Sequence, residues 1–309
     1  MPPVTERAPR LMLLDTPSLY FRAFHGVPST LTAPDGTPVN AVRGLLDFVA
    51  RLVTDRSPTA LVACFDADWR PAFRVAALAQ YKAHRLAADG GELVPAKLVP
   101  QVAVIEQVLD AVGIARLGVP GYEADDLLGT LAARADCPVD VVTGDRDLFQ
   151  LVDDARGVRV LYTATRGVGA HEVVDEAAVT AKYAIPGRRY ADFALLRGDP
   201  SDGLPGVAGI GEKSAAELVR TFGGLEGILA ALRANDPRLS PGLRRKLEAG
   251  LGYLLAAVPV VHVSLDAPVP DDLDAALPAR PRDPDRVRAL TKRWRLGGSM
   301  DRLLTALGR

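Results

Sequence analysis

Short apolar runs alternate with longer stretches of helical periodicity over the first two thirds of the chain. The runs, each ending in a carboxylate, cover residues 11–15, 60–66 and 139–145. Unbroken runs of this length are typical of strands buried on both faces of a parallel sheet. Apolar residues recur at helical spacing between and around them, at residues 39–53, 98–112 and 124–135. This alternation predicts an α/β domain over residues 1–185, with a parallel sheet flanked by helices.

The pattern changes beyond about residue 186. Short helical stretches are separated there by glycines and prolines, and residues 258–265 have the pattern of a strand. We predict a second, mostly helical domain over residues 186–265. A stretch rich in Pro, Asp and Ala comes next and predicts a strap along the surface. With two last helical patterns, at 283–294 and 299–307, it forms a C-terminal segment over residues 266–309.

Composition excludes several classes of protein. With 309 residues, 48% of them apolar, the chain can fill the cores of about two domains and is not a disordered protein. Its two cysteines, Cys64 and Cys137, provide neither a disulfide framework nor a thiolate metal cluster. No apolar run approaches the roughly 20 residues of a membrane span, and the N-terminus lacks the pattern of a signal peptide. We therefore expect a cytoplasmic protein with no membrane partner.

Nine carboxylates stand at strand ends or in tight local clusters. They are Asp15, Asp66, Glu123, Asp125, Asp126, Asp145, Asp147, Asp199 and Asp202. The ligand site of an open α/β sheet lies beyond the carboxyl ends of its strands, so several of these acids should meet. Two ionised carboxylates about 4 Å apart repel by up to about 4 kcal/mol at an effective dielectric near 20, so their convergence requires cations. Any single acid could instead cap a helix or face solvent.

The type of ligand indicates which ions would bind. Hard oxygen ligands, with no thiolate and no suitably spaced histidines, favour Mg²⁺ or Mn²⁺ over Zn²⁺. Two such ions held by shared carboxylates are the apparatus for attack of water on a phosphodiester. Setting the nine acids aside turns the net charge of −1 into +8, so the rest of the molecule is basic. That balance fits a polyanionic substrate.

A basic segment with an interleaved tyrosine lies between the second strand and the acidic helix. Its candidate residues are Arg70, Arg74, Tyr81, Lys82 and Arg85. Such side chains can bind phosphates while the ring stacks on an unpaired base, although the segment could also be an ordinary solvated amphipathic helix. Arg22 comes after the first strand and is expected near the same edge of the sheet, with a surface salt bridge as the alternative.

Residues 206–214, GVAGIGEKS, resemble two different phosphate-binding motifs. They nearly match a nucleotide phosphate loop, but Glu212 interrupts that motif and no strand precedes it. We therefore favour a helix-hairpin-helix, in which Gly206, Gly209 and Gly211 allow a tight turn against a DNA phosphate at a helix N-terminus. Lys213 would contact the same phosphate. Such hairpins grip the duplex backbone without reading its sequence.

Taken together, these motifs resemble those of the bacterial and phage 5′-nucleases, a family that includes the amino-terminal domain of DNA polymerase I and, more distantly, flap endonucleases. The resemblance covers about residues 10–265. It rests on six ordered motifs: LLDTPSLYFRAFHGVP, FDAD, YKAHR, GYEADDLLGTLA, VTGDRDLFQLV and GDPSDGLPGVAGIGEKSA. It implies a PIN-like or resolvase-like sheet with a helical arch over about residues 70–97 and a hairpin-containing helical domain.

The resemblance also implies roles for the candidate residues. A first metal site would use Asp15, Asp66, Glu123, Asp125 and Asp126, and a second would use Asp145, Asp147, Asp199 and Asp202. Lys82 and Arg85 would steer the phosphate near the scissile bond, with Arg22 as a further basic contact. Carbonyl groups of the hairpin, with the hydroxyl of Ser214, would hold K⁺ at the DNA backbone. Gly203 stands where the family frequently has asparagine, and the glycine would loosen the loop that follows Asp199 and Asp202.

The function implied is that of a monomeric, stand-alone 5′-3′ exonuclease and 5′-flap endonuclease that uses two Mg²⁺ or Mn²⁺ ions. Its partners would be branched, flapped or nicked DNA and RNA-primed DNA. It would act in the cytoplasm, at the nucleoid, during replication and repair. Two alternatives remain open from the residues alone. One is a DNA-junction binding module with an idle acidic pocket. The other is a PIN-type RNase, which shares the acidic core but leaves the hairpin unexplained.

Overall fold

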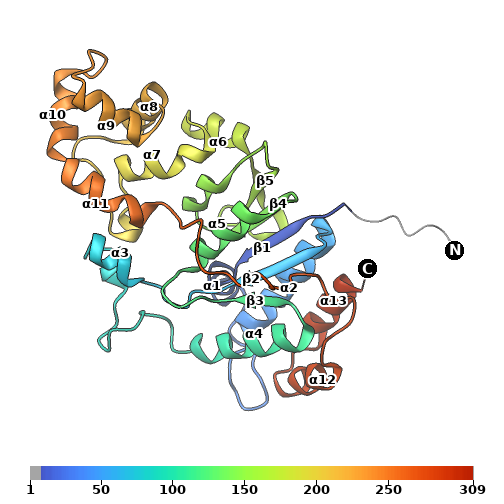
Figure 1. Ribbon diagram of the computed structural model, residues 1–309. Coiled ribbons are helices and arrows are strands. Elements are labelled where there is room, and N and C mark those ends of the chain that lie inside the picture. Colours follow the sequence, from blue (N-terminus) through green and yellow to red (C-terminus); the bar gives the residue numbers. More distant parts are fainter. Residues whose placement is uncertain (1–7, 309) are drawn as a thin grey trace.

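The computed structural model describes residues 8–308 and contains one six-stranded sheet in the order β3-β2-β1-β4-β5-β6 (Figure 1). The strands are β1 Leu11–Asp15, β2 Ala60–Cys64, β3 Ala115–Leu117, β4 Val139–Thr143, β5 Val158–Tyr162 and β6 Glu172–Val174. All neighbouring pairs are parallel except β5 and β6. The three strands predicted from apolar runs are the three at the centre of this sheet, which confirms the predicted α/β class.

Alternation along each strand sends side chains to two separate cores. Leu13 of β1 belongs to the core shared with α5, Ala124–Arg134, and with the helical domain. Its neighbours Met12 and Leu14 belong to the core on the other face. The helices around that second core are α1 Thr16–Gly26, α2 Asn40–Arg56, α4 Val99–Val112, α12 Pro284–Arg293 and α13 Gly297–Leu307. Because both faces are covered, the central strands β1, β2 and β4 are mostly apolar.

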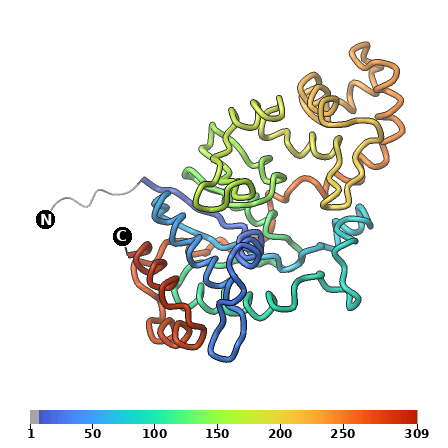
Figure 2. Tube along the Cα trace, turned by 180° about the vertical axis from the view of Figure 1, so that it is seen from behind, coloured from blue at the N-terminus to red at the C-terminus, as the bar shows by residue number. Residues whose placement is uncertain are grey.

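The helical domain lies at the opposite end of the molecule from α12 and α13 (Figure 2). Its helices, preceded by α6 Glu176–Tyr183, are α7 Tyr190–Arg197, α8 Glu212–Phe222, α9 Leu225–Arg233, α10 Pro241–Ala249 and α11 Leu251–Val261. The strand pattern at residues 258–265 was misleading, because residues up to Val261 continue α11. Leu254, Ala257 and Val261 are buried at helical spacing, and a short apolar run cannot by itself distinguish a strand from a buried helix.

The segment expected to form a helical arch is mostly irregular. Between residues 70 and 97 the structure has one short helix, α3 Ala72–Ala77, and a single 3₁₀ turn, η1 Ala83–Arg85. A turn at Gly90 and Gly91 and a proline at Pro95 interrupt the rest of this segment, and such residues end helical structure. The remaining 3₁₀ turns are η2 Asp147–Leu151, η3 Val168–Ala170, η4 Gly187–Arg189 and η5 Pro200–Asp202.

The chain beyond α11 returns to the sheet domain. Residues 275–277 pair with the start of β2, since Leu61 N donates to Ala275 O at 2.8 Å and Leu277 N donates to Thr59 O at 3.1 Å. Helices α13 and α12 then pack against α2 and α4. Within residues 8–308, no helix combines the length and the apolar character needed to cross a bilayer.

Candidate active site

A cavity of about 210 Å³ lies at the carboxyl ends of the central strands. Five of the nine predicted acids line it: Asp15, Asp66, Glu123, Asp125 and Asp145. They come from four segments of the chain. Asp15 ends β1, Asp66 follows β2 and Asp145 follows β4, while Glu123 and Asp125 lie together at the start of α5. The parallel order of the strands is therefore what brings residues more than a hundred positions apart to one place.

Asp15 is the most enclosed of the strand-end acids. Its side chain accepts hydrogen bonds from Ser18 N at 3.1 Å and from Thr143 Oγ1 at 2.6 Å. Burial raises the pKa of Asp15 to about 6, although the bond from Thr143 acts in the opposite direction. Asp66 is fixed differently, by accepting a bond from Ala124 N at 2.7 Å at the start of α5. The acids are thus oriented by neighbouring loops before any ligand binds.

A second group of acids adjoins the first through Asp145. Asp147, Asp199 and Asp202 repel one another and Asp145 electrostatically, and burial is the main reason that the pKa of Asp147 is well above its ordinary value. Oδ1 of Asp147 is buried and finds no hydrogen-bond partner among residues 8–308. An unpartnered buried carboxylate oxygen costs free energy unless a cation reaches it.

The acids do not yet form a closed coordination sphere. Across the described part of the chain, no three acidic, histidine or cysteine side chains converge tightly enough to hold an ion as they stand. The ligand chemistry nevertheless fits hard divalent cations, since the cavity presents oxygen ligands and Asp147 retains an unused acceptor. These side chains would have to move closer together to bind an ion.

Two basic side chains, Lys82 and Arg85, are paired with acids that a metal ion would also need as ligands. Lys82 Nζ donates to Glu123 Oε1, and Arg85 Nη2 lies 2.9 Å from Asp202 Oδ1. Burial alone would lower the pKa of Lys82, but Glu123 and nearby acids raise it well above its ordinary value, so the ammonium group is charged. Both side chains line the cavity. Nη2 of Arg22 lies beside Gly144, which also lines it.

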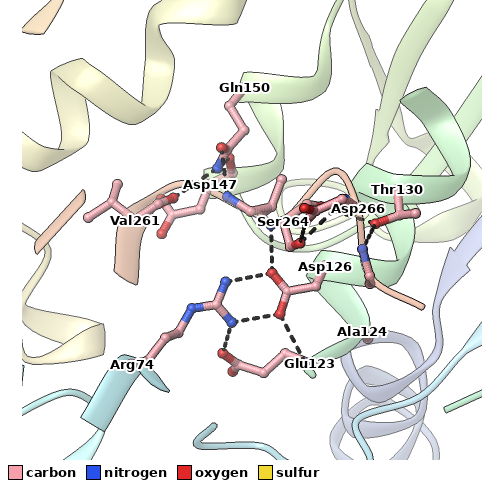
Figure 3. Close-up of polar contacts among 12 residues, drawn as sticks. Arg74, Glu123, Ala124, Asp126, Thr130, Asp147, Gln150, Val261, Ser264 and Asp266 are labelled. Atoms are coloured by element: carbon pink, nitrogen blue, oxygen red, sulfur yellow. Dashed lines mark hydrogen bonds and ion pairs between the residues drawn. The ribbon is translucent and has the colours of Figure 1, made fainter. Parts of the chain in front are cut away.

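Arg74 and Tyr81 do not occupy the DNA-contacting positions expected for them. They are 2% and 3% exposed. Arg74 binds Glu123 and Asp126 (Figure 3), and the Tyr81 hydroxyl donates to Glu123 at 2.8 Å. Neither side chain can meet a phosphate or a base without leaving the core. Arg70 instead donates to the carbonyl oxygens of Tyr81 and Ala79, and so shapes the loop that carries Lys82.

Asp126 also differs from the other predicted metal ligands. It is completely buried, and four N–H groups already bind its two oxygens. They belong to Arg74, which donates twice, to Glu123 N and to Ser264 N. With its acceptor sites filled, Asp126 has no free oxygen to offer an ion. Sequence reasoning could not separate it from Asp125, because both follow the same glutamate.

The predicted hairpin connects α7 to α8. Gly206 and Gly209 adopt positive φ angles of 69° and 76°, and Gly211 is the N-cap of α8. Lys213 lies exposed in the first turn of this helix, followed by Ser214. The sequence did not reveal the part played by Lys246 of α10, whose Nζ donates to Gly209 O at 2.8 Å. The basic run Arg244-Arg245-Lys246 was the only signal of it along the chain.

Gly203 does not loosen its loop. Its φ is 75°, and a Cβ there would lie 2.5 Å from the carbonyl oxygen of Gln80. Lys82 N also donates to Asp202 O at 3.0 Å. The absence of a side chain at this position lets the basic segment pack directly on the loop that carries Asp199 and Asp202.

A parallel sheet with acids at its strand ends, followed by a helical domain with a glycine hairpin, is the combination expected of a 5′-nuclease. Two family descriptions match in succession: "5′-3′ exonuclease, N-terminal resolvase-like domain" over residues 10–184, and "5′-3′ exonuclease, C-terminal SAM fold" over residues 185–285. The chain belongs to the 5′-3′ exonuclease family, as the resemblance predicted.

Curated relatives agree with this assignment. A 5′-3′ exonuclease of Streptomyces coelicolor is 61% identical over 96% of this chain and 99% of its own length, and one of Mycobacterium tuberculosis is 49% identical over 96% and 97%. DNA polymerase I of M. tuberculosis is 37% identical, over 99% of this chain but 33% of its own length. The chain is thus an enzyme of the exonuclease type that is also similar to part of the polymerase.

Solved structures support the fold. The bacteriophage T5 D15 flap endonuclease, in a pseudo-enzyme-product complex with DNA and metal ions, has a TM-score of 0.64 at 16% identity, over 97% of this chain and all of that one. The catalytic core of Rad2 in complex with DNA substrate has a TM-score of 0.56 at 16% identity, over 98% and 93%. At this level of identity the likeness concerns the arrangement of elements.

Proposed function

We propose that this protein hydrolyses phosphodiester bonds of DNA from 5′ ends, using two divalent cations, Mg²⁺ or Mn²⁺, held by the strand-end acids. Its proposed substrates are branched, flapped and nicked DNA and RNA-primed DNA, and its proposed setting is the nucleoid during replication and repair, where it acts as a monomer. The observation that carries this proposal is the convergence of five acids from four separate segments on one cavity that is also lined by Lys82 and Arg85.

We assign the two ions to two adjoining groups of ligands. Asp15, Asp66, Glu123 and Asp125 would hold the first, and Asp145, Asp147, Asp199 and Asp202 the second. Asp126, which was predicted as a ligand of the first ion, would contribute only indirectly, through Arg74 and the start of α5. When bound, such ions lower the pKa of water and stabilise negative charge on phosphate. The unpartnered oxygen of Asp147 and the raised pKa of Asp15 are consistent with sites that depend on cations.

The basic side chains act on the substrate. Lys82 and Arg85, on the wall of the cavity, attract the phosphate to be cleaved and stabilise the charge that develops on it. Arg22 adds a positive charge near Gly144. Because Lys82 and Arg85 are paired with Glu123 and Asp202 in this structure, they are available for the substrate only when those acids have another counter-ion.

The hairpin would hold the duplex. Amide groups at the N-terminus of α8, with Lys213, face a backbone phosphate. The resemblance implies K⁺ here, but the Gly209 carbonyl already accepts a hydrogen bond from Lys246. We therefore propose that this ammonium group supplies the positive charge at the hairpin and that K⁺ is not required.

The test is cleavage of a labelled 5′-flap duplex with Mg²⁺ or Mn²⁺, by the wild type and by Asp145→Ala and Asp66→Ala. We expect the variants to bind DNA but to lose cleavage, and chelation to abolish activity of the wild type. Binding without any product from the wild type would favour the junction-binding module. Preference for a matched RNA flap would favour the PIN-type RNase.

A further inference from the structure

We propose that residues 261–267, which leave α11 and cross the sheet domain, are a tie that holds the two groups of acids at their working separation, with Gln150 as its positioning residue. The inference rests on the proposed function. The tie connects α5, which carries Asp125 and is capped by Glu123, with η2, which carries Asp147 (Figure 3).

One face of α5 binds the tie over three turns. Asp126 accepts from Ser264 N at 2.8 Å. Thr130, one turn later, donates to Ser264 O at 3.3 Å and accepts from Ala267 N at 3.0 Å, and Arg134 donates to Ala267 O at 3.2 Å. Side chains four residues apart lie on one face of a helix. The tie therefore runs closely along the surface of α5.

Gln150 links the tie to η2, the 3₁₀ turn that carries Asp147 of the other group of acids. Its Nε2 donates to Asp147 O at 2.8 Å and to Val261 O at 3.2 Å, and its Oε1 accepts from Val263 N at 3.1 Å. The bond to Asp147 O orients the amide within η2, and the two bonds to Val261 and Val263 join η2 to the tie. No role in cleavage would be expected for Gln150 from chemistry alone, since it carries no charge and does not line the acid cavity.

A glycine makes the close approach of the tie to α5 possible. A Cβ on Gly129 would lie 2.7 Å from Val263 Cγ2 and 2.8 Å from Ser264 O. The second atom is backbone, so an alanine at position 129 must displace the tie. Gly129 lies inside a helix, where glycine is normally unfavourable, and the passage of the tie is the physical reason for it.

The consequence is that the spacing between the two groups of acids depends on a segment that contacts no substrate. Partners that orient metal ligands change metal affinity or activity by about tenfold to a hundredfold when removed. Gln150 and Gly129 should behave in this way.

The experiment compares Gln150→Met and Gly129→Ala with the wild type and with Gly252→Ala. Gly252 is a helical glycine of α11 whose added Cβ would meet nothing within 4 Å, so it controls for the general effect of replacing glycine in a helix. Four quantities are measured: Mn²⁺ affinity by titration calorimetry without DNA, duplex affinity by fluorescence anisotropy in chelator, and kcat and KM on a flap substrate.

We expect both tie variants to bind Mn²⁺ about tenfold more weakly or worse and to lose kcat by a similar factor, with duplex affinity and KM little changed and Gly252→Ala unaffected. Wild-type Mn²⁺ binding and cleavage in folded Gln150→Met would overturn the tie, and that variant decides the matter if Gly129→Ala does not fold. A wild type that binds no Mn²⁺ would instead overturn the proposed function, and the tie with it, because there would be no ion to position.

Discussion

The guanidinium group of Arg74 faces both carboxylate oxygens of Asp126, with nitrogen–oxygen distances of 2.7 and 2.9 Å, at a place where both side chains are almost completely buried. The same group binds Glu123, the N-cap of α5. A basic residue that the sequence suggests for contact with DNA is therefore an internal support of the acidic site. Within the basic segment, Arg74 therefore supports the fold, whereas Lys82 and Arg85 line the cavity where substrate would bind.

Removal of Arg74 should mainly reduce folding stability. Arg74→Met leaves Asp126 buried and without its charge partner, and breaking a buried pair in this way costs about 3–5 kcal/mol. The free energy of unfolding, from urea denaturation in chelator, measures the effect. Arg70→Met is the control, because Arg70 binds only backbone carbonyl oxygens. A fully stable Arg74→Met with weakened duplex binding would restore the DNA-contacting role.

Lys82 should affect the chemical step. Its ammonium group lies on the cavity wall beside Glu123, so Lys82→Ala removes positive charge from the place where the phosphate reacts. We expect a large loss of kcat with little change in KM, which indicates an interaction made mainly in the transition state. Steady-state kinetics on a flap substrate test this. A loss confined to KM would show that Lys82 only helps to bind DNA.

Lys213 should affect binding. It lies exposed in the first turn of α8, away from the acid cavity. Lys213→Ala should weaken duplex affinity at every sequence and reduce the slope of log affinity against log salt by about one ion. Anisotropy titrations at several salt concentrations measure this slope. An unchanged slope, with slower cleavage of bound DNA, would contradict a phosphate contact.

The acid cavity should make the metal-free protein less stable as the pH rises. The folded-state pKa of Asp15 is about 6, above its ordinary value of 3.8, so ionisation of this group opposes folding. The penalty is absent below about pH 4, grows as the pH rises towards 6 and is complete above about pH 7. Thermal unfolding in chelator across this range should show falling stability, and Mn²⁺ should restore it near neutral pH.

Asp15→Asn isolates this effect. The amide is uncharged at every pH, so in chelator the variant should be more stable than the wild type at pH 8, by about 1–3 kcal/mol, and show a shallower pH dependence. It should not cleave DNA. Equal stability of the two proteins at pH 8 would mean that Asp15 is not held in an environment that opposes its charge.

Much of this organisation could be predicted from the sequence. Apolar runs ending in acids located β1, β2 and β4, and the position of Asp15, Asp66 and Asp145 at strand ends is a consequence of parallel topology alone. The hairpin glycines could likewise be recognised, because Gly206 and Gly209 require positive φ. Local patterns of this kind determine where an acid or a glycine stands along the fold.

The sequence could not show which partner each side chain finds. Asp125 and Asp126 are adjacent and chemically identical, yet Asp125 lines the cavity and Asp126 pairs with Arg74. Tyr81 precedes Lys82 directly, and both bind Glu123, yet only Lys82 lines the cavity. These differences depend on contacts between segments far apart in the chain, which no local periodicity records.

The last prediction concerns the cation at the hairpin. The ammonium group of Lys246 lies 2.8 Å from the carbonyl oxygen of Gly209, where K⁺ would otherwise be expected. Because this charge belongs to the chain, it is present whatever salt is in solution. Replacing KCl by NaCl at equal ionic strength should therefore leave duplex binding by the wild type unchanged. Lys246→Met frees the carbonyl group and removes the charge, so its binding should be weaker and should recover better in KCl than in NaCl. Lys213→Ala, which leaves Lys246 in place, is the control and should respond equally to both salts. Dependence of the wild type on K⁺, or a Lys246→Met variant that does not distinguish the two salts, would show that this ammonium group does not replace the ion.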